Sequence, residues 1–309
     1  MPLAPIALFV YNRLEHTKKT ISALQKNELA NDSDLIIFSD AAKNEAGSLA
    51  VKNLRDYLKT VAGFKSLKII ERSDNFGLAK SIIGGVTEVV NQYGKIIVLE
   101  DDLVTSPYFL LYMNEALDLY EKEDRVVSIH SYIYPIKEKL PETFFLKGAD
   151  CWGWATWKRG WDLFEADGQK LLDELISKKL IKLFNWNGAY PYSQMLKGQI
   201  LGLNNSWAIR WHASAFLKDK LTLYPGESLV SNVGLDSSGT HTSNHGANLF
   251  NSKVKETPIK LSKIIVEEDG ESLKKIITYF NSLKMRLLTG VIKIKFLYKN
   301  IKKYVERNR

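Results

Sequence analysis

Four short apolar runs, separated by segments with helical periodicity, are the feature of this sequence that most restricts its fold. They span Pro5–Tyr11, Asp34–Ser39, Leu67–Glu71 and Lys95–Leu99. Strands that are apolar throughout and that alternate with helices are typical of a mostly parallel sheet covered on both faces. The sequence therefore predicts an α/β fold with a doubly wound, Rossmann-like sheet.

The net charge of +8 is concentrated near the C-terminal end of the sequence. Residues 271–309 contain 11 Lys and Arg against 2 Asp and Glu, so the remainder is close to neutral. A neutral body lacks the basic face of a nucleic-acid-binding protein, and we expect no nucleic-acid partner. The single cysteine, Cys151, excludes a disulfide scaffold. Because no apolar run approaches the ~20 residues of a membrane span and no secretory signal is recognisable, we expect a cytoplasmic protein.

Polar and charged side chains follow each of the four predicted strands. Ligands of parallel α/β sheets bind beyond the carboxyl ends of the strands, so these side chains form a candidate binding site. The first strand is not followed by G-x-G-x-x-G, and G-x-x-x-x-G-K-[ST] occurs nowhere, which argues against a nicotinamide-dependent dehydrogenase and a P-loop nucleotidase. The residues that follow the strands are Asn12, Arg13, Asp40, Arg72, Asp74, Asn75, Glu100, Asp101 and Asp102.

Glu100, Asp101 and Asp102 form an acidic triplet at the end of the fourth predicted strand. Three adjacent carboxylates repel one another, and their hard oxygens suit Mg²⁺ or Mn²⁺ with substrate phosphates completing the shell. The alternative is that Asp102 or Thr105 caps a helix starting near Pro107. The position of the triplet beyond a strand, in a sheet without a glycine-rich phosphate loop, favours the metal site.

Seven motifs occur in order between residues 5 and 245. They are PIALFVYNR (5–13), FSDAAKN (38–44), RSDNFGLAKSI (72–82), VLEDDL (98–103), CWGWATWKRGW (151–161), SWAIRW (206–211) and LVSNVGLDSSGTHT (229–242). The set resembles GT-A-fold glycosyltransferases, in particular N-acetylglucosaminyltransferase I and its bacterial relatives. The resemblance implies a metal-dependent, inverting hexosyl- or N-acetylhexosaminyltransferase. Such an enzyme would move a sugar from a nucleoside-diphosphate sugar, typically a UDP-sugar, to a glycan or lipid-linked acceptor in bacterial surface-polysaccharide assembly.

The resemblance also implies roles for individual residues. Asp40 would accept a hydrogen bond from the base, and Arg72 would lie along the ribose and diphosphate. Asp102 would be the direct ligand of Mn²⁺ or Mg²⁺, and the ion would stabilise the departing diphosphate. The donor-binding residues implied in this way are Tyr11, Asn12, Arg13, Asp40, Arg72, Asn75, Gly77 and Asp101.

Four of the seven tryptophans lie close together in the sequence. Trp152 and Trp154, on either side of Gly153, are predicted to form a platform on which a sugar ring stacks. Trp157 and Trp161 are predicted to be core residues. The alternative is that the whole cluster is core.

A second metal ligand and the catalytic base are predicted less directly. His241, in a G-T-H context, would contact the metal or the diphosphate, although a single histidine is more often structural. The resemblance places the base in residues 204–208, which contain no acid, so Asp150 and Asp236 are the candidates. This departure leaves open a non-catalytic protein that binds a nucleotide sugar or glycan. A metal-dependent phosphohydrolase is a third interpretation.

We expect one GT-A domain over residues 1–250 and a basic amphipathic helical tail over residues 251–309. The nucleotide-sugar half would cover about residues 1–130 and the acceptor half about residues 131–250. The tail would either pack on the body or lie on an anionic surface at the inner face of the cell membrane.

Overall fold

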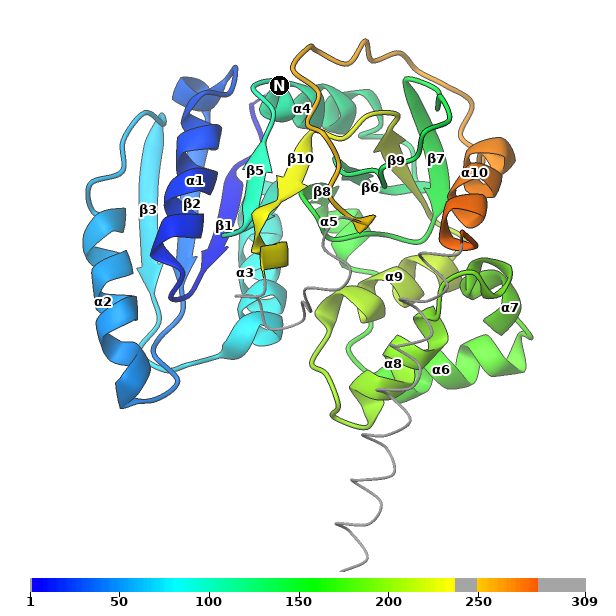
Figure 1. Ribbon diagram of the computed structural model, residues 1–309, viewed down its shortest axis with the longest axis horizontal. Helices are drawn as coiled ribbons and strands as arrows, with labels where there is room; N and C mark the ends of the chain where they lie inside the picture. Colours follow the sequence, from blue (N-terminus) through cyan, green and yellow to red (C-terminus); the bar gives the residue numbers. More distant parts are fainter. Residues whose placement is uncertain (1, 237–248, 283–309) are drawn as a thin grey trace, which may run out of the picture.

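A computed structural model describes residues 2–236 and 249–282 and contains one large sheet across both halves of the chain (Figure 1). Strands β1 to β4 run parallel, whereas β8 is antiparallel to both of its neighbours. The predicted α/β class with a mostly parallel sheet is confirmed. The strands, in spatial order, are β3 (Ser66–Glu71), β2 (Asp34–Ser39), β1 (Ile6–Val10), β4 (Lys95–Glu100), β8 (Trp154–Trp157), β6 (Val126–His130), β9 (Leu221–Pro225) and β7 (Thr143–Lys147).

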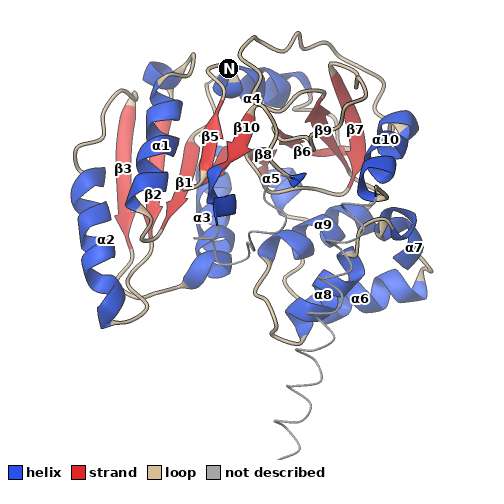
Figure 2. Ribbon diagram, in the orientation of Figure 1, coloured by secondary structure: helices blue, strands red, loops and turns tan. Residues whose placement is uncertain are grey.

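Helices cover both faces of this sheet (Figure 2). Ile6 and Leu8 of β1 belong to the core beneath α1 and α2, whereas Ala7 and Phe9 face the core beneath α3. Alternate side chains of an apolar strand thus bury on opposite sides, as a doubly covered sheet requires. The helices are α1 (Leu14–Gln25), α2 (Glu45–Leu58), α3 (Gly77–Tyr93), α4 (Phe109–Leu119), α5 (Lys158–Trp161), α6 (Gly168–Ser177), α7 (Ile181–Phe184), α8 (Tyr192–Ile200), α9 (Trp207–Leu217) and α10 (Gly270–Phe280).

A small second sheet covers the acidic triplet. It pairs β5 (Leu103–Thr105) antiparallel with β10 (Val230–Asn232), and the short helix η3 (Val233–Asp236) follows directly. The Val233 amide donates to the carbonyl of Asp102 at 2.8 Å. The segment that carries the late motif LVSNVGLD therefore lies against the end of β4.

The helix-cap interpretation of the triplet is wrong. Helix α4 begins at Phe109, and its N-cap residue, Tyr108, makes no side-chain capping bond. Thr105 instead accepts a hydrogen bond from the side chain of Asn27 at 2.9 Å. Asp102 thus lies before a strand, not at a helix start, and its charge needs another partner.

The expected helical tail is only partly correct. Residues 251–269 contain no helix, and α10 begins at Gly270. Ile276 and Phe280 of α10 are fully buried, so this helix packs on the body. Residues 283–309 lie outside the described residues. No helix within residues 2–236 and 249–282 is long and apolar enough to cross a membrane.

Candidate functional site

Several predicted site residues meet at the carboxyl end of β4. Val98 of β4 pairs with Trp154 of the antiparallel strand β8, and His130 of β6 pairs with the same Trp154. The residues that precede Trp154 therefore run alongside the residues that follow Val98. This register puts the start of β8, and with it the preceding segment Asp150–Gly153, at the same end of the sheet as the acidic triplet, although about 50 residues separate them in the sequence.

Arg13 forms the electrostatic centre of this group of residues. Its guanidinium donates to the carboxylates of Asp101 and Asp102, the latter at 2.7 Å. The backbone of Asp101 is also fixed, because its carbonyl accepts from the Thr20 hydroxyl at 2.9 Å. Arg13 follows β1 and the two acids follow β4, so adjacent parallel strands bring them together. The sequence predicted these residues at one site but not their mutual ion pair.

Burial changes the protonation of the triplet. It is the main cause that raises the pKa of Glu100 to about 8, with further contributions from the charges of Asp102 and Asp101. Burial likewise raises the pKa of Asp101 to about 6, against the opposing effect of Arg13. Glu100 is therefore mostly protonated at pH 7. The proton on Glu100 and the ion pairs of Arg13 therefore reduce the repulsion among the three carboxylates, which the sequence analysis expected a metal ion to relieve.

Asp40 organises the turn that precedes α3. Its two carboxylate oxygens accept from the backbone amides of Phe76 at 2.9 Å and Gly77 at 2.8 Å, and from the Asn75 side chain at 3.1 Å. The N-cap residue of α3 makes no side-chain capping bond of its own, so Asp40 of the β2 end serves the helix start instead. With the Ala41 amide also bound at 3.0 Å, the carboxylate is fully engaged. In this structure Asp40 positions the turn, and its expected bond to a nucleotide base stays a prediction.

Arg72 and Tyr11 flank this turn. The Arg72 guanidinium carbon lies 5.4 Å from the centre of the Phe38 ring and 5.0 Å from that of Phe76. Its buried Nε has no hydrogen-bond partner among the described residues. The Tyr11 hydroxyl accepts from the Lys43 amide at 3.0 Å, which fixes the loop after β2.

Asn12, the remaining predicted residue of the first loop, is half-buried between β1 and Arg13.

The tryptophan cluster divides differently from the prediction. Trp154 is 1% exposed and packs against Trp207 and Trp211, with ring centres 5.5 and 5.9 Å away. A sugar ring has no access to Trp154, so its predicted stacking role is wrong; as the first residue of β8 it is turned into the core. Trp157 and Trp161 are each 4% exposed, which confirms them as core residues.

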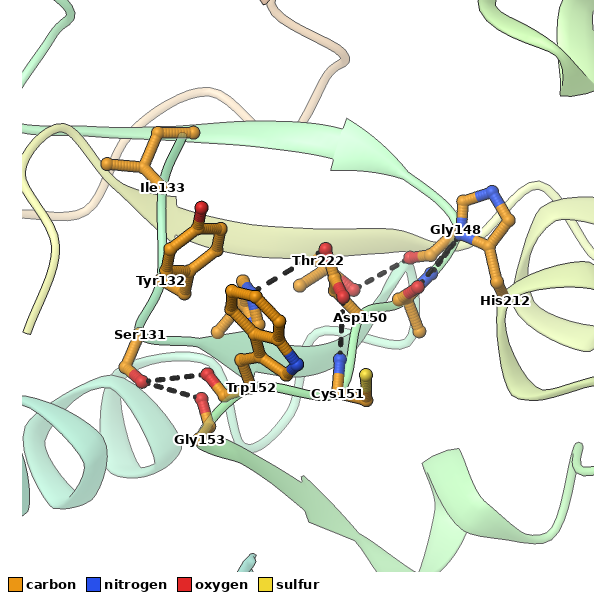
Figure 3. A network of polar contacts seen from close by, with 12 residues as sticks. Ser131, Tyr132, Ile133, Gly148, Asp150, Cys151, Trp152, Gly153, His212 and Thr222 are labelled. Atoms are coloured by element: carbon orange, nitrogen blue, oxygen red, sulfur yellow. Dashed lines mark hydrogen bonds and ion pairs between the residues drawn. The ribbon is translucent and has the colours of Figure 1, made fainter. Parts of the chain in front are cut away.

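Trp152 and Gly153 follow Asp150 and Cys151 and lie beside Ser131 and Tyr132, as Figure 3 shows. The Ser131 hydroxyl donates to the carbonyls of Gly153 at 2.7 Å and Trp152 at 3.2 Å. Gly153 has a φ of +64°, and a Cβ there would lie 2.4 Å from the Ser131 Oγ, so only glycine fits. The half-buried Trp152 ring contacts Tyr132 edge-on at 4.6 Å.

Asp150 and His130 form a second polar centre at this edge. Asp150 accepts from the Cys151 amide at 2.8 Å, and its other oxygen lies 3.7 Å from Nε2 of His130. His130 is fully buried, and burial lowers its pKa to about 4. Sequence reasoning missed His130. Its position at the end of the buried run VVSIH was the signal available.

The remaining candidates are Asp236 and His241. Asp236 is the last residue of η3, and His241 lies outside the described residues. The backbone of η3 lies directly against Asp102, because a Cβ on Gly234 would be 2.2 Å from its Oδ2. The described ranges contain no group of three or more His, Cys, Asp or Glu that could hold a metal ion.

Comparisons with known proteins give structural likenesses only. No family model and no curated protein matches the chain. A mannosyltransferase from Pyrobaculum calidifontis, solved with GDP-Man and Mn²⁺, shares 10% identity over 42% of this chain and 36% of its own, with a TM-score of 0.30. TarS from S. aureus shares 13% over 47% of this chain and 24% of its own, with a TM-score of 0.30.

A third structure, described as a nucleotide-diphospho-sugar transferase from Desulfovibrio desulfuricans G20, shares 12% identity over 54% of this chain and 69% of its own, with a TM-score of 0.33. Solved structures that this chain resembles thus include nucleotide-sugar transferases. The matched region spans about a third of the mannosyltransferase and about a quarter of TarS.

Proposed function

We propose that this chain is a glycosyltransferase that uses a nucleoside-diphosphate sugar. The observation that carries the proposal is the convergence, at one edge of the sheet, of two polar centres. Arg13 with Asp101 and Asp102 forms the first, beside the turn that Asp40 holds. Asp150, in the segment before β8, belongs to the second with His130. One centre would bind the donor and the other would face the acceptor.

The donor site would use groups that are already fixed. Tyr11 and Asn12 would contact the nucleoside, which we propose to be uridine. Arg72, whose Nε has no hydrogen-bond partner among the described residues, would contact the diphosphate. Gly77, whose amide donates to Asp40, would lie beside the diphosphate at the start of α3.

A divalent cation would bind here through a carboxylate together with the phosphates of the donor. The described residues offer hard carboxylate oxygens but no complete cage, and Mg²⁺ commonly binds through one or two carboxylates plus substrate phosphates. Asp102 would hold the ion, with His241 as a further candidate. When bound, Mn²⁺ or Mg²⁺ would supply charge stabilisation for the departing diphosphate.

The finer assignments extend the proposal. The transferred group would be a hexose or N-acetylhexosamine, transferred with inversion to a glycan or lipid-linked acceptor in the assembly of a bacterial surface polysaccharide. Trp152 at the site edge would contact the acceptor or the donated sugar. A membrane-linked acceptor would suit a protein whose basic residues 283–309 contact an anionic membrane.

A thermal-shift experiment tests the donor site. Nucleoside diphosphates and their sugars are screened with and without Mn²⁺ on the wild type and on Asp102→Asn. A ligand of the native state raises its stability. We expect a Mn²⁺-dependent shift with a uridine nucleotide that the variant loses. The exposed Asp162, which pairs with Lys158, provides the control substitution Asp162→Asn. Absence of a shift with every nucleotide would overturn the proposal.

A second candidate is a non-catalytic protein that binds a nucleotide sugar or glycan. It is favoured by the start of α9, where the resemblance places the base. Ser206 there caps the helix by accepting from the Ile209 amide at 3.2 Å, and Trp207 is 3% exposed. Release of nucleoside diphosphate from the donor found in the screen separates the two, because a binding protein would shift without turnover.

A further inference from the structure

His130 is a buried histidine with unmet hydrogen-bonding capacity. Its side chain is 0% exposed, and neither Nδ1 nor Nε2 bonds to any residue within 2–236 or 249–282. Buried polar atoms are bonded in the great majority of native proteins, so an orphaned ring needs an explanation. Oδ2 of Asp150 lies 3.7 Å from Nε2, just beyond hydrogen-bonding distance.

Asp150 is accessible while its surroundings are not. Its side chain is 24% exposed, whereas Tyr224 and Tyr192 beside it are 3% and 9% exposed. Oδ1 is fixed by the amide of Cys151, which leaves Oδ2 facing His130. Burial, and next the charge of Asp150, raise the pKa of both tyrosines, so their hydroxyls stay protonated. Asp150 is thus a reachable anion beside neutral hydroxyl donors.

The position of Asp150 relative to the acidic triplet is set by the backbone. The β4–β8 register runs the residues before Trp154 alongside the residues after Val98. Cys151, which follows Asp150, is buried near both groups, and the charges of Asp150, Glu100 and Asp102 add to burial in raising the pKa of its thiol. Asp150 thus lies at the same end of the sheet as the triplet, on the side of β8 occupied by His130 of β6 and Tyr224 of β9.

We propose that Asp150 removes the proton from the acceptor hydroxyl and that His130 holds the Asp150 carboxylate in position. The inference rests on the proposed glycosyl transfer. In the step, the acceptor oxygen forms a bond to C1 of the donor sugar as the bond from C1 to the diphosphate oxygen breaks. The diphosphate leaves with the electron pair, and the hydroxyl proton moves to Oδ2 of Asp150.

His130 acts through Asp150 and does not touch the substrate. Its ring is neutral, so Nε2 can carry a hydrogen and donate it to Oδ2 once the 3.7 Å separation closes. The bond would fix one rotamer of the carboxylate and satisfy a ring nitrogen that is otherwise orphaned. This gives the buried histidine a function that packing alone does not.

Asp150→Asn with water and azide as acceptors tests the proposal. Both reactions use the donor found in the thermal-shift screen, and the products measured are nucleoside diphosphate and glycosyl azide. Water must lose a proton, whereas azide is already an anion and needs no base. We expect hydrolysis to fall about 100-fold or more in the variant, while azide transfer stays within about threefold of the wild type. Asp162→Asn is expected to leave both rates unchanged.

The outcomes separate the inference from the proposed function. A wild type that releases no nucleoside diphosphate from any donor overturns both. An active wild type with unchanged hydrolysis in Asp150→Asn overturns the role of Asp150 alone. Equal loss of hydrolysis and azide transfer would also overturn it, because such a loss shows damage to the donor site. The azide reaction reports folding in the same sample.

His130→Phe tests the positioning role, since it keeps a ring of similar shape without nitrogen atoms. We expect kcat for hydrolysis to fall about tenfold, with the donor KM and azide transfer unchanged. His130→Gln, whose amide can again bond the carboxylate, is expected to recover part of the rate. Equal loss of both reactions in His130→Phe, or no recovery with glutamine, would identify a purely structural histidine.

Discussion

At the scale of single residues, Gly234 is the tightest contact of the candidate donor site. A Cβ at this position would lie 2.2 Å from Oδ2 of Asp102 and 2.9 Å from Nη1 of Arg13. We expect Gly234→Ala to destabilise the fold by about 1–3 kcal/mol and to weaken nucleotide binding, because the Arg13–Asp102 pair must move. Gly84, exposed on α3 with nothing within 4 Å, is the matched control.

Gly84→Ala is expected to stabilise the protein by about 0.5–1 kcal/mol, since alanine is the better helix former. Urea unfolding of the two variants measures both effects. Similar stability of Gly234→Ala and the wild type would show that η3 does not lie against Asp102.

Glu100 gives a pH dependence with a definite sign. Its pKa is about 8 in the folded protein against an ordinary 4.5, so the folded state holds the proton more tightly than the unfolded state. Stability from this group is complete below pH 4.5 and is lost as pH rises towards 8. We expect wild-type stability, measured with EDTA, to fall between pH 7 and 8, and Glu100→Gln to flatten that slope. An equal slope in both proteins would contradict the shift.

Trp154 and His130 show that residue type alone does not identify the side chains that line the site. Tryptophans near a glycine suggested a sugar platform, but the first residue of β8 turns into the core, and side-chain direction depends on a strand that was not predicted. His130 carried no local motif. Its significance comes from Asp150, 20 residues away in sequence and brought close only by the pairing of β6 with β8.

At the scale of elements, the first four strands follow closely from the sequence. The predicted run Asp34–Ser39 is β2 itself, and the other three differ from the structure by one residue at their ends. Strands β1, β2 and β4 are buried on both faces, so they read as continuous apolar runs, whereas β3 lies at the edge of the sheet and is partly exposed. Strands β6 to β9 were not predicted, because they are short and alternate with irregular segments and aromatic residues that read equally well as core or loop.

Asp40 connects β2 to α3, because it follows β2 and its carboxylate accepts hydrogen bonds at the start of α3. In Asp40→Asn, one of the two acceptor oxygens is replaced by a donor that would face the amides of Phe76 or Gly77. We expect a loss of about 1–2 kcal/mol in urea unfolding and weaker nucleotide binding, because the turn is no longer held. Asp74→Asn in the same turn, which loses only an exposed bond to Ser73, should change stability by less than about 0.5 kcal/mol. Equal effects of the two substitutions would contradict the capping role.

At the scale of the whole molecule, one sheet joins the two sequence halves, and α10 packs against the second half of the chain. Phe280 of α10 lies with its ring centre 4.8 Å from that of Tyr134 and 4.9 Å from that of Tyr190. The apolar face of α10 is therefore occupied by the body and is not free to enter a membrane. Surface attraction to a membrane, where it occurs, has to come from the basic residues that follow.

Residues 283–309 contain 9 Lys and Arg against 1 Glu, so a chain that ends at residue 282 keeps α10 but loses the whole net charge of +8. Because each basic residue near an anionic surface contributes up to about 1 kcal/mol, we expect the full chain to co-sediment with vesicles containing phosphatidylserine. The shortened chain should remain in the supernatant, and about 0.5 M salt should release the full chain, since screening weakens the attraction. Neutral phosphatidylcholine vesicles are the control. Equal sedimentation of both chains with anionic vesicles would place the membrane-binding surface on the body and contradict a role for the basic tail.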